Sequence, residues 1–189
     1  MEQQEITHLL ISARGGDPES LNALLPLVYG ELHAMAHRSL LSQRPDQTLN
    51  TTSLVHETFL KLFDRAHLDA RDRKHFFCTA AMAMRQIIID NARRHLSQKR
   101  GGKVDHVDLD NTDIPIHDRA YELVALDDAL THLQELDERL GRVVELRFFG
   151  GLTVEETAEI LDVDARTVKR DWRKARAVLY LALQGESGA

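Results

Sequence analysis

One segment, residues 153–176, constrains this chain more than any other, because it reads as two short helices separated by a tight turn. Thr153, followed three residues later by Glu156, forms the capping-box pattern that begins a helix. The run Asp162-Val163-Asp164 interrupts that helix, and Asp164 is a suitable N-cap for the next one. The pattern predicts a helix-turn-helix, the motif that lays its second helix in the major groove of DNA.

Positive charge dominates the second predicted helix. Residues 166–176 hold six cations and a single anion, Asp171, beside an apolar stripe at helical spacing. Many charged helix faces are only solvated, and this is the alternative interpretation. An excess of this size after a capped helix and a short turn favours contact with phosphates and base edges. The candidate DNA-binding residues are Arg166, Thr167, Lys169, Arg170, Arg173, Lys174 and Arg176.

The whole chain is acidic, with a formal net charge of −6 over 189 residues, so its cationic surface must be local. A second basic cluster lies between residues 65 and 103, where ten cations face three aspartates. Two cationic patches on an acidic protein favour local, electrostatically steered contacts with nucleic acid.

The sequence shows little sign of secretion, membrane insertion or catalysis. The N-terminus, MEQQEITHLL, is unlike a signal peptide, and no stretch has the apolar length of a membrane span, so we expect a cytoplasmic protein. His33 and His37 have a spacing that zinc can use, but no third ligand is evident. Because no catalytic motif occurs, we expect neither enzymatic activity nor a metal or cofactor.

Helical periodicity over most of the chain predicts an all-α protein. The expected helices occupy about residues 6–14, 18–36, 52–63, 73–96, 123–133 and 137–149, followed by the helix-turn-helix. The periodicity stops between Gly101 and Asp118, in a segment rich in aspartate. We therefore expect two small helical domains, residues 1–100 and 119–189, joined by a flexible acidic linker, residues 101–118.

Two basic helical units on a tether suit a protein that contacts two separated DNA segments. The sequence resembles the bacterial extracytoplasmic-function (ECF) sigma factors of the primary-sigma-like family, over about residues 6–183. The matching stretches are LVHETFLKLF (54–63), MRQIIIDNARRHLSQKR (84–100) and ELRFFGGLTVEETAEILDVDARTVKRDWRKARAVL (145–179). The third stretch is the most specific, because its order, turn and cation spacing all match.

The resemblance implies a promoter-specificity subunit, with core RNA polymerase and promoter DNA as partners. The first domain would be the region-two module, which binds the polymerase clamp and melts the minus-ten element. The second would be the region-four module, which reads the minus-thirty-five element through the helix-turn-helix. The implied polymerase-binding residues are Leu54, Glu57, Phe59 and Leu60, and the implied minus-ten residues are His75, Arg85, Arg93, Arg94, Lys99 and Arg100.

Aromatic side chains near the second basic cluster could stack on an unpaired base. The helical spacing of Phe76 and Phe77 favours core packing over this role. His75 is the better-exposed candidate.

The sequence departs from the family pattern just before Leu54. Where most relatives carry acids, this chain has Asn50, Thr51, Thr52 and Ser53. One interpretation is that Thr52 or Ser53 is a helix N-cap. The other is that phosphorylation of Thr51, Thr52 or Ser53 supplies the missing charge at a helix N-terminus. A serine/threonine kinase and an anti-sigma protein are therefore candidate regulatory partners.

A second departure is Asp162, where relatives often have glycine in the turn. Aspartate tolerates the left-handed conformation, so we expect the turn to be kept.

Two other functions stay open at this point. A helix-turn-helix transcriptional regulator that is not a polymerase subunit would be expected to carry an N-terminal ligand or phosphoacceptor domain with strands, and no strand pattern is visible. A nucleic-acid-processing enzyme would need a metal or acid–base site.

Overall fold

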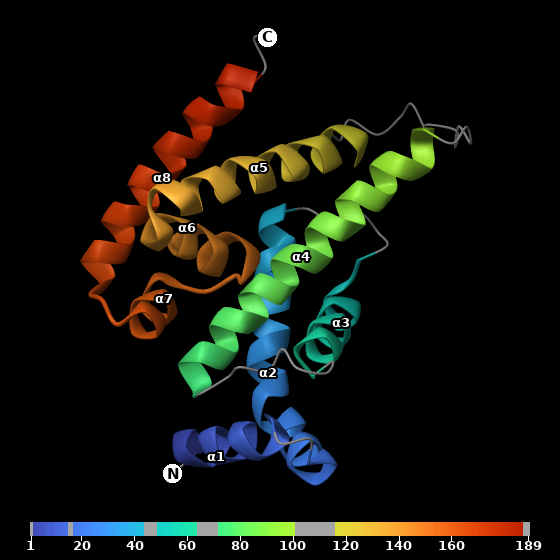
Figure 1. Cartoon of the computed structure of the whole chain (residues 1–189), viewed down its shortest axis with the longest axis vertical. Helices are drawn as coiled ribbons and strands as arrows, with labels where there is room; N and C mark the ends of the chain where they lie inside the picture. Colours follow the sequence, from blue (N-terminus) through green and yellow to red (C-terminus); the bar gives the residue numbers. More distant parts are fainter. Residues whose placement is uncertain (1, 15–16, 44–48, 64–71, 101–115, 187–189) are drawn as a thin grey trace.

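The computed structural model describes residues 2–14, 17–43, 49–63, 72–100 and 116–186. All regular elements in these residues are helical, which confirms the predicted all-α class. They are α1 (Glu2–Arg14), α2 (Pro18–Gln43), α3 (Thr51–Phe63), α4 (Arg73–Arg100), α5 (Ile116–Leu136), α6 (Glu138–Val144), the π-helical segment η1 (Glu145–Phe149), α7 (Val154–Leu161) and α8 (Ala165–Glu186) (Figure 1). No helix in the described ranges has the length and apolar character needed to cross a membrane.

Short polar side chains begin several of these helices, as N-caps do. The side chain of Asp17 accepts from the Ser20 N–H at the start of α2 (3.2 Å). The side chain of Asp72 accepts from the His75 N–H at the start of α4 (2.8 Å). The side chain of Asp137 accepts from the Leu140 N–H at the start of α6 (3.1 Å). Local capping chemistry therefore sets these helix starts.

The start of α3 differs from the expected one. The Ser53 N–H donates to Asn50 Oδ1 (2.9 Å), and the Leu54 N–H donates to the Asn50 carbonyl (3.0 Å). Asn50 is therefore the N-cap, and the interpretation of Thr52 or Ser53 as the cap is wrong. Asparagine caps a helix as well as serine does, which explains why the helix begins one residue earlier.

Two boundaries near the predicted linker also differ. α4 continues to Arg100, past its expected end at residue 96, and α5 begins at Ile116, inside the segment 101–118. Ile116 directly follows Pro115 in the sequence, and proline is common where helices begin. Residues 101–115 lie outside the described ranges. The two domain boundaries stay a prediction.

One continuous core contains side chains from both predicted domains, among them Leu32 of α2, Met84 of α4, Leu130 of α5 and Phe149 of η1. Figure 1 shows α4 running between α3 on one side and α5 on the other. α4 packs against α3, α5 and η1. The two halves of the chain are therefore closely packed in this arrangement.

Gly150 and Gly151 make part of this packing possible. A Cβ atom on Gly150 would lie 2.8 Å from the Ala81 side chain of α4. A Cβ atom on Gly151, whose φ is +60°, would lie 2.5 Å from the Met35 carbonyl of α2. The sequence predicts a helix end at these glycines, and the structure adds that the turn fits between α2 and α4 because neither residue has a side chain.

Candidate nucleic-acid interface

The predicted helix-turn-helix is confirmed as α7 and α8, down to its caps. The Glu156 N–H donates to Thr153 Oγ1 (3.1 Å), and the Thr153 N–H donates to Glu156 Oε2 (2.6 Å). α7 ends at Asp162, which adopts the left-handed conformation (φ 54°, ψ 47°). The side chain of Asp164 then accepts from the Thr167 N–H (2.8 Å) at the start of α8. The turn thus keeps its left-handed residue without glycine.

These caps and one ion pair shift two carboxyl pKa values. The backbone and side-chain hydrogen bonds from Thr167 lower the pKa of Asp164. Partial burial raises the pKa of Glu156, but the hydrogen bonds from Thr153 and the charge of Arg38 outweigh burial, and its pKa ends below the usual value. Both carboxylates are therefore held in the charged form that caps a helix.

The buried and exposed faces of α8 are clearly separated. Val168, Ala175 and Leu179 are buried, and the Arg147 guanidinium lies 5.0 Å from the centre of the Trp172 ring. The six predicted cationic contacts of α8 are all exposed. Four of them share one stripe at i, i+3, i+4 and i+7 spacing, opposite the buried face: Arg166, Lys169, Arg170 and Arg173.

Thr167 differs from the other predicted contacts. Its hydroxyl donates to Asp164 Oδ2 (2.8 Å), and the residue is half-buried. It therefore helps to close the turn, while the neighbouring cations face outward.

Asp171, the single anion of residues 166–176, is buried, which the sequence interpretation did not predict. It is 1% exposed, and its carboxylate lies 2.8 Å from Arg139 Nε of α6 and 3.2 Å from Arg170 Nε. The pair with Arg139 ties α8 to α6, and the pair with Arg170 holds one exposed cation in place. Its spacing from Val168 and Ala175, three and four residues, places it on the apolar stripe, and this was the signal available in the sequence.

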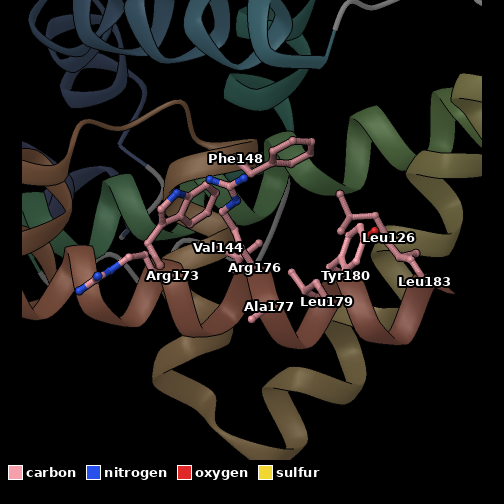
Figure 2. A pocket seen from close by; sticks show the side chains of 10 residues that line it. Leu126, Val144, Phe148, Arg173, Arg176, Ala177, Leu179, Tyr180 and Leu183 are labelled. Carbon is pink, nitrogen blue, oxygen red and sulfur yellow. The ribbon is translucent and has the colours of Figure 1, made fainter. Parts of the chain in front are cut away.

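An open groove of about 580 Å³ runs along α8 (Figure 2). Its lining is mostly apolar, with two arginines from α8: Leu126, Val144, Phe148, Trp172, Arg173, Arg176, Ala177, Leu179, Tyr180 and Leu183. Tyr180 and Leu181 expose large apolar side chains near the C-terminal end of the same helix. Apolar surface of this kind is typical of protein–protein contacts.

The second basic cluster lies on α4, and its predicted contacts differ in exposure. Arg94 is exposed, and its Nε donates to the Asp90 carbonyl of its own helix (3.3 Å). His75 is half-buried. Phe76 and Phe77 are buried in the core, so core packing is confirmed for both. The side chains of Lys99 and Arg100 lie outside the described residues.

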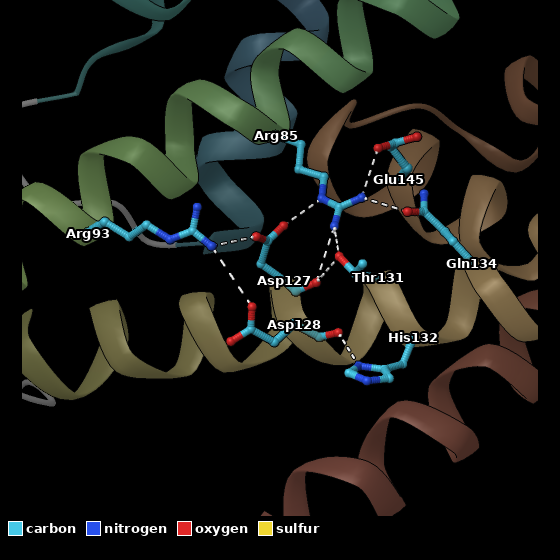
Figure 3. Close-up of polar contacts among 8 residues, drawn as sticks. All are labelled: Arg85, Arg93, Asp127, Asp128, Thr131, His132, Gln134 and Glu145. Atoms are coloured by element: carbon cyan, nitrogen blue, oxygen red, sulfur yellow. Dashed lines mark hydrogen bonds and ion pairs between the residues drawn. The ribbon is translucent and has the colours of Figure 1, made fainter.

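Arg85 does not lie on open surface, in contrast to its predicted role in DNA binding. Its side chain is 11% exposed, and its Nε donates to Asp127 Oδ1 (2.7 Å). Further hydrogen bonds join it to Gln134, Glu145 and Thr131 (each 3.1 Å) (Figure 3). Burial raises the pKa of Glu145, although the hydrogen bond and charge of Arg85 oppose the shift. In this arrangement Arg85 joins α4 to α5 and η1.

Arg93 makes the second contact between α4 and α5. Its Nη2 donates to Asp127 Oδ2 (3.1 Å) and lies 3.9 Å from Asp128 Oδ1, as Figure 3 shows. The Arg93 side chain is 50% exposed. Asp127 therefore bridges two arginines that the family resemblance assigns to the candidate minus-ten surface.

The predicted polymerase-binding residues lie on α3 but are not equally accessible. Leu60 is 69% exposed, Glu57 is exposed and Phe59 is half-buried. Leu54 is fully buried, so it supports this surface from beneath and does not form part of it, since it lies on the apolar face of α3. Thr52 is exposed at the start of this helix, with Thr51 and Ser53 half-buried beside it.

Within the part of the chain that the structure describes, the pair His33 and His37 is not part of a larger metal-binding group. Over the described residues, no group of three histidine, cysteine, aspartate or glutamate side chains could hold a metal ion. His33 instead lies against the ring of Tyr29, with 5.9 Å between ring centres.

Comparison with known proteins gives one family. A solved structure described as CnrH in complex with the cytosolic domain of CnrY is 20% identical, covers 96% of this chain and 98% of that chain, and aligns with a TM-score of 0.41. No curated protein sequence matches. The ECF sigma factor family matches residues 3–185, which include both helical halves and the whole helix-turn-helix. The chain therefore belongs to the ECF sigma factor family.

Proposed function

We propose how this sigma factor divides promoter recognition among its helices. As an ECF sigma factor it directs core RNA polymerase to promoter DNA. The exposed stripe of α8 reads the upstream, minus-thirty-five element, with its cations on phosphates and base edges. The observation that carries this proposal is the separation of faces on α8, where Val168 and Ala175 are buried and Arg166 and Arg173 are exposed.

The other two surfaces complete the proposal. The basic face of α4, with Arg94 exposed, holds the melted minus-ten strand, because an unpaired strand needs cations along its backbone. The exposed part of α3, with Glu57 and Leu60, binds the polymerase clamp. The two halves would act as the region-two and region-four domains, joined at residues 101–118. The chain would contribute specificity to the polymerase and no catalysis of its own.

Reconstituted transcription tests this function directly. The purified chain is mixed with core RNA polymerase and a library of promoter fragments, and the transcripts are sequenced. We expect transcripts that start at a common promoter pattern and that need both the chain and core enzyme. Binding to promoter DNA without core enzyme, together with no transcript, would instead identify a helix-turn-helix regulator.

The hydroxyl residues at the start of α3 are a proposed control point. Thr51, Thr52 and Ser53 are the first residues after the N-cap Asn50, where a negative charge meets the positive end of the helix dipole. Thr52 is the most exposed of the three. We propose that a serine/threonine kinase phosphorylates Thr52, with Ser53 as second choice, and so supplies the charge that the clamp receives in other family members.

Acidic substitution of Thr52 is expected to tighten binding to core RNA polymerase. A neutral hydrogen bond contributes about 0.5–1.5 kcal/mol, and a charge-assisted one roughly twice as much. Thr52→Glu should therefore lower the Kd for core enzyme by about two- to tenfold, measured by titration. Thr52→Gln has nearly the same shape without the charge and should bind like the wild type. Equal affinity of the wild type, Thr52→Glu and Ser53→Asp would reject the switch.

The groove on α8 is the candidate surface for a protein regulator such as an anti-sigma protein. Its apolar lining and the exposed Tyr180 and Leu181 support this proposal, because exposed apolar side chains are costly unless a partner covers them.

A further inference from the structure

The acids of α5 pair with two arginines of α4, Arg85 and Arg93, that the family resemblance assigns to the minus-ten surface. Asp127 accepts from both Arg85 and Arg93, at 2.7 and 3.1 Å, and Asp128 lies 3.9 Å from Arg93 (Figure 3). The side chains of Arg85 and Asp127 are 11% and 14% exposed, so this contact excludes most water.

A guanidinium binds carboxylate and phosphate with the same planar fork of N–H donors. An arginine whose donors are filled by a carboxylate cannot place them on a DNA phosphate at the same time. Arg85 has donors engaged by Asp127, Thr131 and Glu145 together. DNA can reach Arg85 only after α5 has moved away from α4.

The masking is selective. Outside the α4–α5 contact, the halves are also joined by Arg38 of α2, whose Nη2 lies 3.1 Å from Glu156 Oε2 of α7. This second contact lies at the capping box of α7 and leaves the cations of α8 exposed. The packed arrangement therefore covers part of the minus-ten surface and keeps the upstream-reading surface open.

The ion pairs alone do not hold this contact closed. Buried ion pairs recover in attraction roughly what they lose in desolvation, so such a pair contributes little net stability while both partners are present. The rest of the contact is the apolar core that the two halves share, so opening needs a binding partner that favours the open state or a change that leaves a buried charge unpaired.

We propose that Asp127 and Asp128 act as an intramolecular mimic of DNA phosphates, a latch that closes α5 onto α4. The free chain withholds Arg85 and the Asp127-bound Nη2 of Arg93 from single-stranded DNA, and displacement of α5 releases them. This proposal rests on the proposed role of α4 in holding the melted strand.

The test uses the full chain with Asp127→Asn and Asp128→Asn together, which keep the side-chain shape and remove the charge. Dyes on Met82→Cys and Leu181→Cys, both exposed in the wild type, report the separation of α4 and α8 in a Cys78→Ser background. Affinity is measured for a single-stranded DNA oligonucleotide of random sequence. Glu122→Gln with Glu135→Gln is the matched control, because it removes two exposed carboxylates from the same helix outside the latch.

We expect the latch variant to separate the dyes and to bind the oligonucleotide about 5- to 150-fold more tightly than the wild type, the usual range for coupled sites. The matched control should gain far less affinity for the oligonucleotide and should keep the wild-type dye separation. An equal gain in both variants, or an unchanged dye separation in the latch variant, overturns the latch. Arg94→Glu lies outside the latch and tests the underlying function separately. If this variant binds the oligonucleotide more weakly while the latch variant gains no affinity, α4 binds DNA and the latch is wrong. If Arg94→Glu leaves binding unchanged, the role of α4 and the latch both fail.

Discussion

Replacing Arg166, Lys169 and Arg173 together with alanine is expected to abolish recognition of the upstream promoter element and leave the fold intact. All three side chains are exposed on the stripe of α8 opposite Val168 and Ala175. A side chain that reads a base edge contributes about 1–3 kcal/mol, so three losses remove about 3–9 kcal/mol, which is comparable with the gap of about 4–10 kcal/mol between specific and non-specific binding. Each lost phosphate contact also lowers the salt dependence of binding by about one unit of slope.

The measurement is binding of the polymerase holoenzyme to a promoter fragment over a range of salt concentrations. Arg170 stays in place because it also pairs with the buried Asp171, so its removal would mix effects on folding and on binding. Arg142→Ala is the matched control, since this exposed cation pairs with Glu138 on α6, away from the stripe. Wild-type affinity and salt slope in the triple variant would show that α8 does not read the upstream element.

The helix-turn-helix was predictable because its signals are local. Thr153 and Glu156 satisfy each other within one helical turn, and Asp162 and Asp164 lie on either side of a single residue. Capping depends on side chains three residues apart, which a sequence displays directly. For the second helix, the excess of cations beside a clear apolar stripe favoured a DNA-binding face over a face that is only solvated.

The capping of α3 shows where local reasoning leaves several solutions. Asn50, Thr52 and Ser53 are all competent N-caps, and sequence alone gives no reason to choose Asn50. In the structure the side chain and carbonyl of Asn50 accept the first hydrogen bonds of α3, and Leu54 and Val55 of this helix are fully buried. Propensity alone therefore leaves open a boundary that only the hydrogen bonds of the folded chain identify.

The contacts between the halves could not be predicted from periodicity. Arg85 and Asp127 are 42 residues apart, on helices that each satisfy the helical pattern alone. A cation on a predicted DNA-binding helix and a pair of acids on another helix are each consistent with solvated surface. Only the packing of α5 on α4 brings them together and removes Arg85 from open surface.

Reversing the charge of Arg93 and Arg94 to glutamate is expected to abolish promoter opening while core-polymerase binding is kept. Both arginines are exposed on α4, distant in sequence from the α3 residues proposed to bind the clamp. Two carboxylates in their place would repel the backbone of the unpaired strand, which such surfaces hold through cations. Permanganate reactivity of promoter thymines reports opening, and titration with core enzyme reports holoenzyme assembly.

The same variant separates the two roles of Arg93. A carboxylate at position 93 would face Asp127 and Asp128, so repulsion should open the contact between α4 and α5. If masking alone limited the chain, this variant would melt promoters more readily than the wild type. If Arg93 and Arg94 hold the strand, it fails to melt them although α5 has moved, and Arg94→Glu alone shows part of the same loss. Normal permanganate reactivity in the double variant would remove both arginines from the melting surface.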